Sequence, residues 1–158
     1  MLFRSGARDR AGRFDPSLVA GMQAAGLAAC CIPEELGGLG VDRLADLMAV
    51  VHRLAEADGS LALVAHMHIS GTWSLSRARR ARLNDTTTTG DDGGLTALLR
   101  AVAAGEVWLC AAVTEAGTNF FHPRTTLTPT ADGWVLDGTK GFATGSPAAT
   151  HFSANADR

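Results

Sequence analysis

The sequence is poor in cysteine and in net charge, and each shortage excludes classes of protein. Its 158 residues include 3 cysteines, and Cys30 and Cys31 are adjacent, so the chain has neither a disulfide framework nor a C-x-x-C motif. A reducing cytoplasm is the expected location. Lys and Arg number 14 against 16 Asp and Glu, a net charge of −2. Such a balance offers no overall attraction to nucleic acid or to an anionic membrane surface.

Long apolar runs are also missing, so no segment is expected to cross a membrane. The most apolar stretch, residues 18–32, is interrupted by Gly21, Gln23 and Gly26, whereas a spanning helix needs about 20 apolar residues. The arginine-rich start is broken by aspartates and is followed by no apolar core. We interpret it as a frayed terminus and not as a signal peptide; a transit peptide is the alternative.

The familiar catalytic and metal-binding patterns are absent as well. The 5 histidines have no metal-ligand spacing, and no serine stands in a G-x-S-x-G context. No G-x-G-x-x-G lies between a strand and a helix, and the glycines of 37–40 follow the acidic Glu34 and Glu35, which would repel a phosphate. The arginines of 77–82 are interpreted as a solvated helix face, with phosphate binding as the less favoured alternative. We name no catalytic residue and no metal ligand.

What is present is enough apolar material for a core, 46% of all residues, arranged first at helical spacing. Asp15-Pro16 is a good helix opening, because the carboxylate caps free N–H groups and proline has no N–H to leave unpaired. Gly26 suits a left-handed stop. The clearest helix spans residues 44–55, where apolar side chains recur every three or four residues. We expect Asp42 to cap it.

Two further helices are expected, one on each side of a polar loop. Asp58-Gly59 ends the helix of 44–55, and the helix after it is apolar on several sides, as expected of a helix buried in a bundle. Residues 84–94 are rich in Thr, Asp and Gly, which indicates a loop. Residues 95–104 predict a short final helix.

From Glu106 onward the pattern indicates short strands. Asp132-Gly133 predicts a hairpin turn, because this pair readily adopts the required backbone angles. The strands are expected at residues 107–114, 125–130, 134–136 and 151–154. The predicted fold class is therefore α+β, with an α-helical bundle over 1–105 followed by an incomplete antiparallel β domain over 106–158. A sheet of so few strands is not stable by itself. These strands must therefore pack against the helices or against further sequence.

Two segments at strand ends could bind a ligand. Residues 112–119 and 138–146 each place a hydroxyl and backbone amides beside apolar or aromatic side chains. A flat heteroaromatic molecule such as a flavin needs a wall to stack on and short donors at its ring edge. From these residues alone, two ordinary β-turns remain the simpler interpretation.

Four stretches in fixed order resemble one family. The chain carries PEELGGLG at 33–40, LAEADGSLA at 54–62, AVTE at 112–115 and DGWVLDGTKGFATG at 132–145. Together they are similar to the front half of the acyl-CoA dehydrogenase family. The resemblance implies a helical domain followed by part of a middle β domain, and an FAD-dependent oxidoreductase that transfers hydride from a CH–CH bond to flavin N5.

The same resemblance implies a cofactor site. In the family, the positions of Val113 and Thr114 meet the pyrimidine edge of the flavin, and the aromatic at Phe142 flanks the ring. Ala143 belongs to the same segment, and Thr144 donates its hydroxyl towards N5. The implied partners are a small-molecule substrate, with an acyl-CoA thioester among the candidates, and copies of the same chain, since the full-length family forms homo-oligomers.

Departures from the family pattern bear on the substrate. Phe120 stands where the family has a small serine beside the flavin or the thioester, so we assign Phe120 to substrate binding and expect a different pocket. A flavin-dependent monooxygenase of the dibenzothiophene-desulfurising type is the first alternative. The family's catalytic glutamate has no counterpart here, so we expect an N-terminal fragment with an incomplete FAD site that is inactive alone. A non-catalytic remnant or interaction module is the second alternative.

Overall fold

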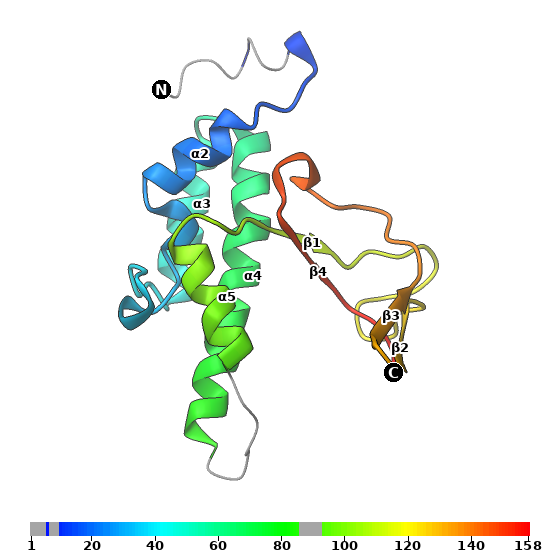
Figure 1. The fold of residues 1–158 in the computed structure, drawn as a ribbon. Coiled ribbons are helices and arrows are strands. Elements are labelled where there is room, and N and C mark those ends of the chain that lie inside the picture. Colours follow the sequence, from blue (N-terminus) through cyan, green and yellow to red (C-terminus); the bar gives the residue numbers. More distant parts are fainter. Residues whose placement is uncertain (1–5, 7–9, 86–92) are drawn as a thin grey trace.

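A computed structural model describes residue 6, residues 10–85 and residues 93–158. Most of the loop expected at 84–94 lies outside the described residues, as do two of the N-terminal arginines, Arg4 and Arg8. In the described part, the helices gather on one side and the strands on the other, with the long helix α4 running along the boundary (Figure 1). The predicted α+β class is confirmed.

The helices begin and end close to where the periodicity places them. Their bounds are α2 Ser17–Ala24, α3 Leu44–Ala55, α4 Gly59–Asn84 and α5 Gly93–Ala103, with short 3-10 turns η1 Leu27–Ala29, η2 Glu34–Leu36 and η3 Ser146–Ala148. Gly26 has φ +76°, the left-handed conformation expected of it. Helix α4 continues through the arginine run, so these side chains do lie on a helix.

Asp58 starts α4, while Asp42 does not start α3. The Asp58 carboxylate accepts a hydrogen bond from the backbone N–H of Leu61 at 3.0 Å. The prediction that Asp42 caps α3 was wrong, because that helix begins after Arg43 without a side-chain cap. The Asp42 carboxylate instead binds Arg80 on α4 at 2.5 Å. Attraction to a guanidinium distant in sequence outcompetes the local cap.

Replacing Asp58 by alanine is expected to destabilise the protein by about 1 kcal/mol, since it removes the acceptor that satisfies one N–H of the first turn of α4. Urea denaturation followed by circular dichroism measures this. Asp58→Ser keeps a capping oxygen and should recover most of the loss. Equal losses in both variants would contradict the capping role.

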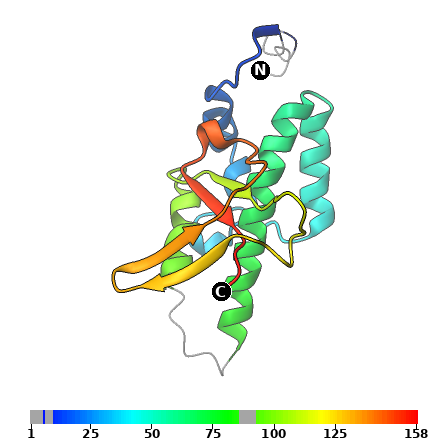
Figure 2. The same cartoon turned by 90° about the vertical axis from the view of Figure 1, so that its right-hand side faces the viewer.

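The strands form two separate pairs. β1 Leu109–Ala112 pairs in parallel with β4 His151–Ala154. β2 Thr126–Thr130 and β3 Gly133–Asp137 form the expected antiparallel hairpin. The antiparallel expectation does not extend to β1 and β4, because the long connection between them lets the chain return in the original direction. Figure 2 shows the hairpin projecting as a ribbon beyond the helices.

Strand β1 is buried against the helices, whereas the other strands are not. Trp108 joins the core formed with α2, α3 and α4, and Val107 and Leu109 join the core formed with α5. Their side chains are at most 4% exposed, while β3 and β4 are exposed along their whole length. The helical core thus packs against the first strand, and β4 pairs with that strand.

All three cysteines are free and buried. Among the described residues, no helix has the length and apolar character needed to cross a bilayer. Within the same residues, no group of three or more His, Cys, Asp or Glu side chains is placed to hold a metal ion.

Candidate functional site

The two segments predicted to meet a flavin lie side by side where the chain leaves β1. The backbone N–H of Gly141 donates to the carbonyl oxygen of Thr114 at 2.7 Å. Three residues further on, the carbonyl of Thr144 accepts from the Cys110 thiol at 3.2 Å. Residues 141–144 therefore run back along residues 110–114. Predicted positions that are about thirty residues apart in sequence are neighbours in space.

The surface formed by residues 110–114 and 141–144 has hydrogen-bonding groups that no other protein group uses. Within the described part of the chain, the hydroxyls of Thr114 and Thr144 bond to no protein group, and the backbone N–H groups of 142–144 donate to none. The ring of Phe142 is 72% exposed beside them. Unused donors next to an exposed aromatic ring are the features that an edge-bonded, stacked heteroaromatic ligand requires.

Val113 and Ala143 are half-buried and contribute backbone. The Ala143 carbonyl accepts from the N–H of Ser146 at 3.0 Å, which turns the chain away after Thr144. Gly145 makes this turn with φ +85°, an angle that glycine adopts without strain.

Phe120 lies in a separate turn. Its ring is 57% exposed and packs edge to face on Phe121, with ring centroids 5.5 Å apart. The Phe120 carbonyl accepts from the side-chain amide of Asn155 at 2.8 Å, which ties this turn to the end of β4. The structure does not bring its ring into aromatic contact with Phe142 among the described residues.

Glu115 and Lys140 are positions that the sequence analysis did not assign. They form an ion pair whose side chains are 4% and 12% exposed. The hydrogen bonds from Lys140 and Thr125 lower the pKa of Glu115 to about 2. Both residues stand inside the quoted motifs, directly beside Thr114 and Gly141, so a charged residue of each sign in these two motifs was the available signal.

His68 anchors β1 to the helices. Its Nδ1 accepts the N–H of Leu109 at 3.0 Å, so its Nε2 carries the proton and donates to the Ala28 carbonyl at 3.0 Å. Its ring stacks on Trp108 with centroids 4.0 Å apart. Burial lowers the pKa of His68 to about 4. The histidine is therefore an uncharged structural link, as expected of a packed histidine.

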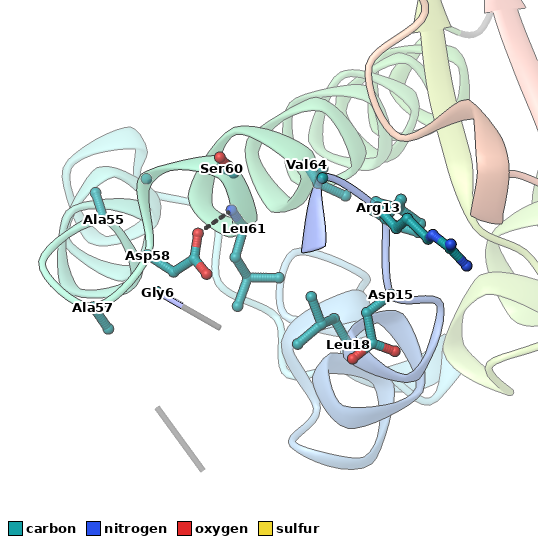
Figure 3. A pocket seen from close by; sticks show the side chains of 13 residues that line it. Gly6, Arg13, Asp15, Leu18, Ala55, Ala57, Asp58, Ser60, Leu61 and Val64 are labelled. Atoms are coloured by element: carbon teal, nitrogen blue, oxygen red, sulfur yellow. Dashed lines mark hydrogen bonds between the residues drawn. The ribbon is translucent and has the colours of Figure 1, made fainter. Parts of the chain in front are cut away.

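A cavity lies elsewhere in the described part of the chain. It has a volume of about 610 Å³ and is bounded by the start of α4, by α2 and by the segment before α2. Figure 3 shows Leu18 and Leu61 flanking it from two helices, with Asp58 bonded to the start of its own helix. None of the residues predicted to bind a cofactor or substrate lines this cavity, so it adds nothing to the surface beside β1.

The residues present fit one side of a flavin. The exposed Phe142 ring offers a stacking surface, and the unused donors of Thr114 and Thr144 match the carbonyl and nitrogen acceptors at a flavin edge. The opposite face of such a ring is left open by the described residues.

Comparison with known proteins supports the resemblance drawn from the motifs. Residues 4–78 match the model of the acyl-CoA dehydrogenase N-terminal domain. Butyryl-CoA dehydrogenase from Megasphaera elsdenii superposes on 96% of this chain and 38% of its own, with a TM-score of 0.73 and 24% identity. Residues 4–78 therefore match the N-terminal domain of the acyl-CoA dehydrogenase family, and the described part of the chain has the acyl-CoA dehydrogenase fold. The recognition drawn from the four motifs is thereby confirmed.

Relatives of another kind are more similar in sequence. L-evernosamine nitrososynthase from a Micromonospora species is 35% identical over 151 residues, which cover 96% of this chain and 34% of that protein. The X-ray structure of KijD3 with FMN and dTDP-3-amino-2,3,6-trideoxy-4-keto-3-methyl-D-glucose matches 98% of this chain and 36% of that one, with a TM-score of 0.79 and 32% identity. The chain thus has the fold of flavin oxidoreductases and spans about a third of the length of the curated relatives it matches.

Proposed function

We propose that this chain forms the flavin-facing N-terminal part of an oxidoreductase that oxidises the amino group of a nucleotide-linked amino sugar. One observation supports it above the others. The exposed Phe142 ring and the unused donors of residues 142–144 lie together in a chain that is 35% identical to an amino sugar nitrososynthase over 96% of its length. FMN, which is bound in the structure of a 32% identical relative, is the first candidate cofactor, and FAD is the second.

Under this proposal, each predicted residue either stacks on the flavin ring, donates a hydrogen bond to it or holds a residue that does. Phe142 covers one ring face. Thr114 donates its hydroxyl to the pyrimidine edge, with the half-buried Val113 holding the backbone before it. The Thr144 hydroxyl and the Ala143 N–H donate to acceptors of the ring and favour negative charge on it. The bound flavin supplies the two-electron redox chemistry.

Phe120 is proposed to contact substrate. Together with Phe121 it forms an exposed aromatic pair on a turn, and such a surface can stack against a nucleotide base or the apolar face of a sugar. A bulky ring here, in place of the family's small serine, favours a substrate other than a slender acyl thioester.

Acyl-CoA dehydrogenation with FAD is a second candidate function. The match of residues 4–78 to the acyl-CoA dehydrogenase N-terminal domain favours it. A comparison of FMN with FAD separates the two proposals in part: tighter binding of FMN supports the nitrososynthase type, and tighter binding of FAD supports the dehydrogenase.

The direct test is titration of the purified chain with FMN, followed by quenching of flavin fluorescence. Weak binding is expected, because the chain offers one side of the cofactor site, and Thr144→Val should weaken it further, about five- to tenfold, since one hydrogen bond to the ring is lost. Thr128→Val, on the exposed hairpin, removes a hydroxyl outside the site and should bind FMN like the wild type. No binding by the wild-type chain, or equal binding by Thr144→Val, would contradict the assigned site.

A further inference from the structure

Glu115 and Lys140 form an ion pair that joins the two segments of the candidate site, residues 112–119 and 138–146. Glu115 directly follows Thr114, and Lys140 directly precedes Gly141, whose N–H bonds to the Thr114 carbonyl at 2.7 Å. The two charged side chains form an ion pair and are 4% and 12% exposed. A buried charge pair at this junction is unusual, because removing both charges from water is costly unless further hydrogen bonds compensate.

The Glu115 carboxylate has such hydrogen bonds on both oxygens. Its Oε2 accepts the backbone N–H of Arg124 at 2.5 Å. Its Oε1 accepts the backbone N–H and the hydroxyl of Thr125, at 3.1 and 2.5 Å, as well as Lys140. The carboxylate therefore holds the start of the hairpin segment against the end of β1.

The Lys140 ammonium is equally saturated. Besides Glu115 it donates to the carbonyl and the side-chain oxygen of Asn155, at 2.7 and 2.8 Å. Asn155 in turn donates to the carbonyl of Phe120 at 2.8 Å. An ammonium has three N–H donors, and all three are used. Lys140 has no donor left for a flavin or a substrate.

The backbone at Gly138 lies very close to Thr125, which bonds to the Glu115 carboxylate. Gly138 has φ +159°, and a Cβ placed on it would lie 2.7 Å from the Cα of Thr125, inside van der Waals contact. The chain can thus pass Thr125 at this distance only with glycine at position 138. The same Thr125 bonds to the Glu115 carboxylate through its N–H and its hydroxyl, so the close approach lies beside the pair.

We propose that the Glu115–Lys140 pair is a positioning site, which holds residues 113–116 and 140–144 in the one arrangement where both present their free donors to the flavin. The inference rests on the proposed function, because it assigns the pair to the same cofactor surface. Neither residue touches the reacting atoms. Glu115 is excluded as a proton acceptor because its pKa is already held low by its donors, and the pair as a whole is neutral.

Amide hydrogen exchange of the purified chain tests the ordering without any flavin. In Glu115→Gln and in Lys140→Met, exchange protection at Arg124, Thr125 and Gly141 is expected to fall at least tenfold. The matched control is Glu56→Gln, which breaks an exposed pair with Arg53 on α3 and should leave these three amides unchanged. Unchanged protection in both Glu115→Gln and Lys140→Met would overturn the proposal.

A double variant, Glu115→Leu with Lys140→Met, guards against simple unfolding. Apolar replacement of both charges leaves no unpaired buried ion, so the double variant should lose less stability than Glu115→Gln or Lys140→Met, yet it cannot hold the amides of Arg124 and Thr125. We expect their protection to stay at least tenfold lower. If the double variant exchanges like the wild type, the pair does not order these segments.

FMN titration of the same variants tests the link to the cofactor. The dissociation constant is expected to rise at least tenfold in Lys140→Met and in the double variant, while Lys140→Arg, which keeps the charge, should recover part of the affinity. Lost amide protection with unchanged FMN affinity would overturn the positioning role. Absence of FMN binding by the wild type would overturn the proposed function and the cofactor part of this inference, whereas the exchange result is judged separately.

Discussion

Replacing Gly38 by alanine is expected to lower the free energy of unfolding by about 3 kcal/mol, and the melting temperature by about 10 °C. A Cβ on Gly38 would lie 2.6 Å from the carbonyl carbon of Ile32. Ile32 is completely buried, so its backbone has no space into which to move. Urea denaturation and thermal melting, both followed by circular dichroism, measure the loss.

The contact with Ile32 belongs to a tight loop. The Ile32 carbonyl accepts the N–H of Gly40 at 2.8 Å, and the N–H of Gly38 donates to the Pro33 carbonyl at 3.2 Å. A side chain at position 38 would force both hydrogen bonds to open or the core residue to shift. The glycine at position 38 is therefore required for close approach, and not for a left-handed backbone angle.

Gly59→Ala is the matched control. Position 59 is the first residue of α4, and a Cβ there would meet nothing within 4 Å. Alanine has the higher helix propensity, so this variant should be unchanged or more stable by up to about 1 kcal/mol. A Gly38→Ala protein that melts like the wild type would show that the loop after η2 relaxes without cost.

The second large effect is a loss of stability in mild acid that depends on His68. Its pKa is lowered by burial from an ordinary 6.5 to about 4. Below pH 6.5 the unfolded chain binds a proton that the folded chain excludes, so stability falls as the pH falls from 6.5 to 4. The full difference amounts to about 3 kcal/mol. Above pH 6.5 this contribution is constant.

The structural reason is that a proton on Nδ1 would face the N–H of Leu109, which now donates to that nitrogen at 3.0 Å. Protonation would thus break the link between α4 and the start of β1. His68→Gln keeps one donor and one acceptor but loses the stacking on Trp108. We expect it to be less stable by about 2 kcal/mol at pH 7.5, with a flatter dependence on pH between 6.5 and 4.5.

Urea denaturation at half-unit steps of pH between 7.5 and 4.5 checks this prediction. His52→Gln is the control, because the His52 side chain is 79% exposed on α3 and its replacement should leave the slope unchanged. The lowered pKa of Glu115 acts only further into acid, since stability from a depressed carboxyl is lost below its ordinary value of 4.5. A wild-type slope that persists in His68→Gln would assign the effect to another group.

Local patterns determined most of the elements. Helix α3 spans Leu44–Ala55, the residues that the apolar spacing predicts, and β4 spans the predicted residues 151–154. The hairpin turn at Asp132-Gly133 also follows from residue preferences alone. These features depend on neighbours in sequence, so the sequence contains the whole of their cause.

Asp42 shows where local reasoning fails. A carboxylate just before an apolar repeat is a good helix cap in isolation. Here the guanidinium of Arg80, from a helix that comes later in the chain, binds it at 2.5 Å. Only tertiary packing brings this competitor within reach, and a charged partner is preferred over a backbone N–H.

In the candidate site, too, some features could be predicted from the sequence and others depend on the tertiary structure. The resemblance of four motifs to a known family implied a flavin and the residues Val113, Thr114, Phe142, Ala143 and Thr144, whereas residue chemistry alone left two ordinary β-turns as the simpler interpretation. The parallel course of β1 and β4, the contact between Gly141 and Thr114 and the buried Glu115–Lys140 pair arise from the folded chain. They depend on which distant segments share one small volume, and no local preference encodes that choice.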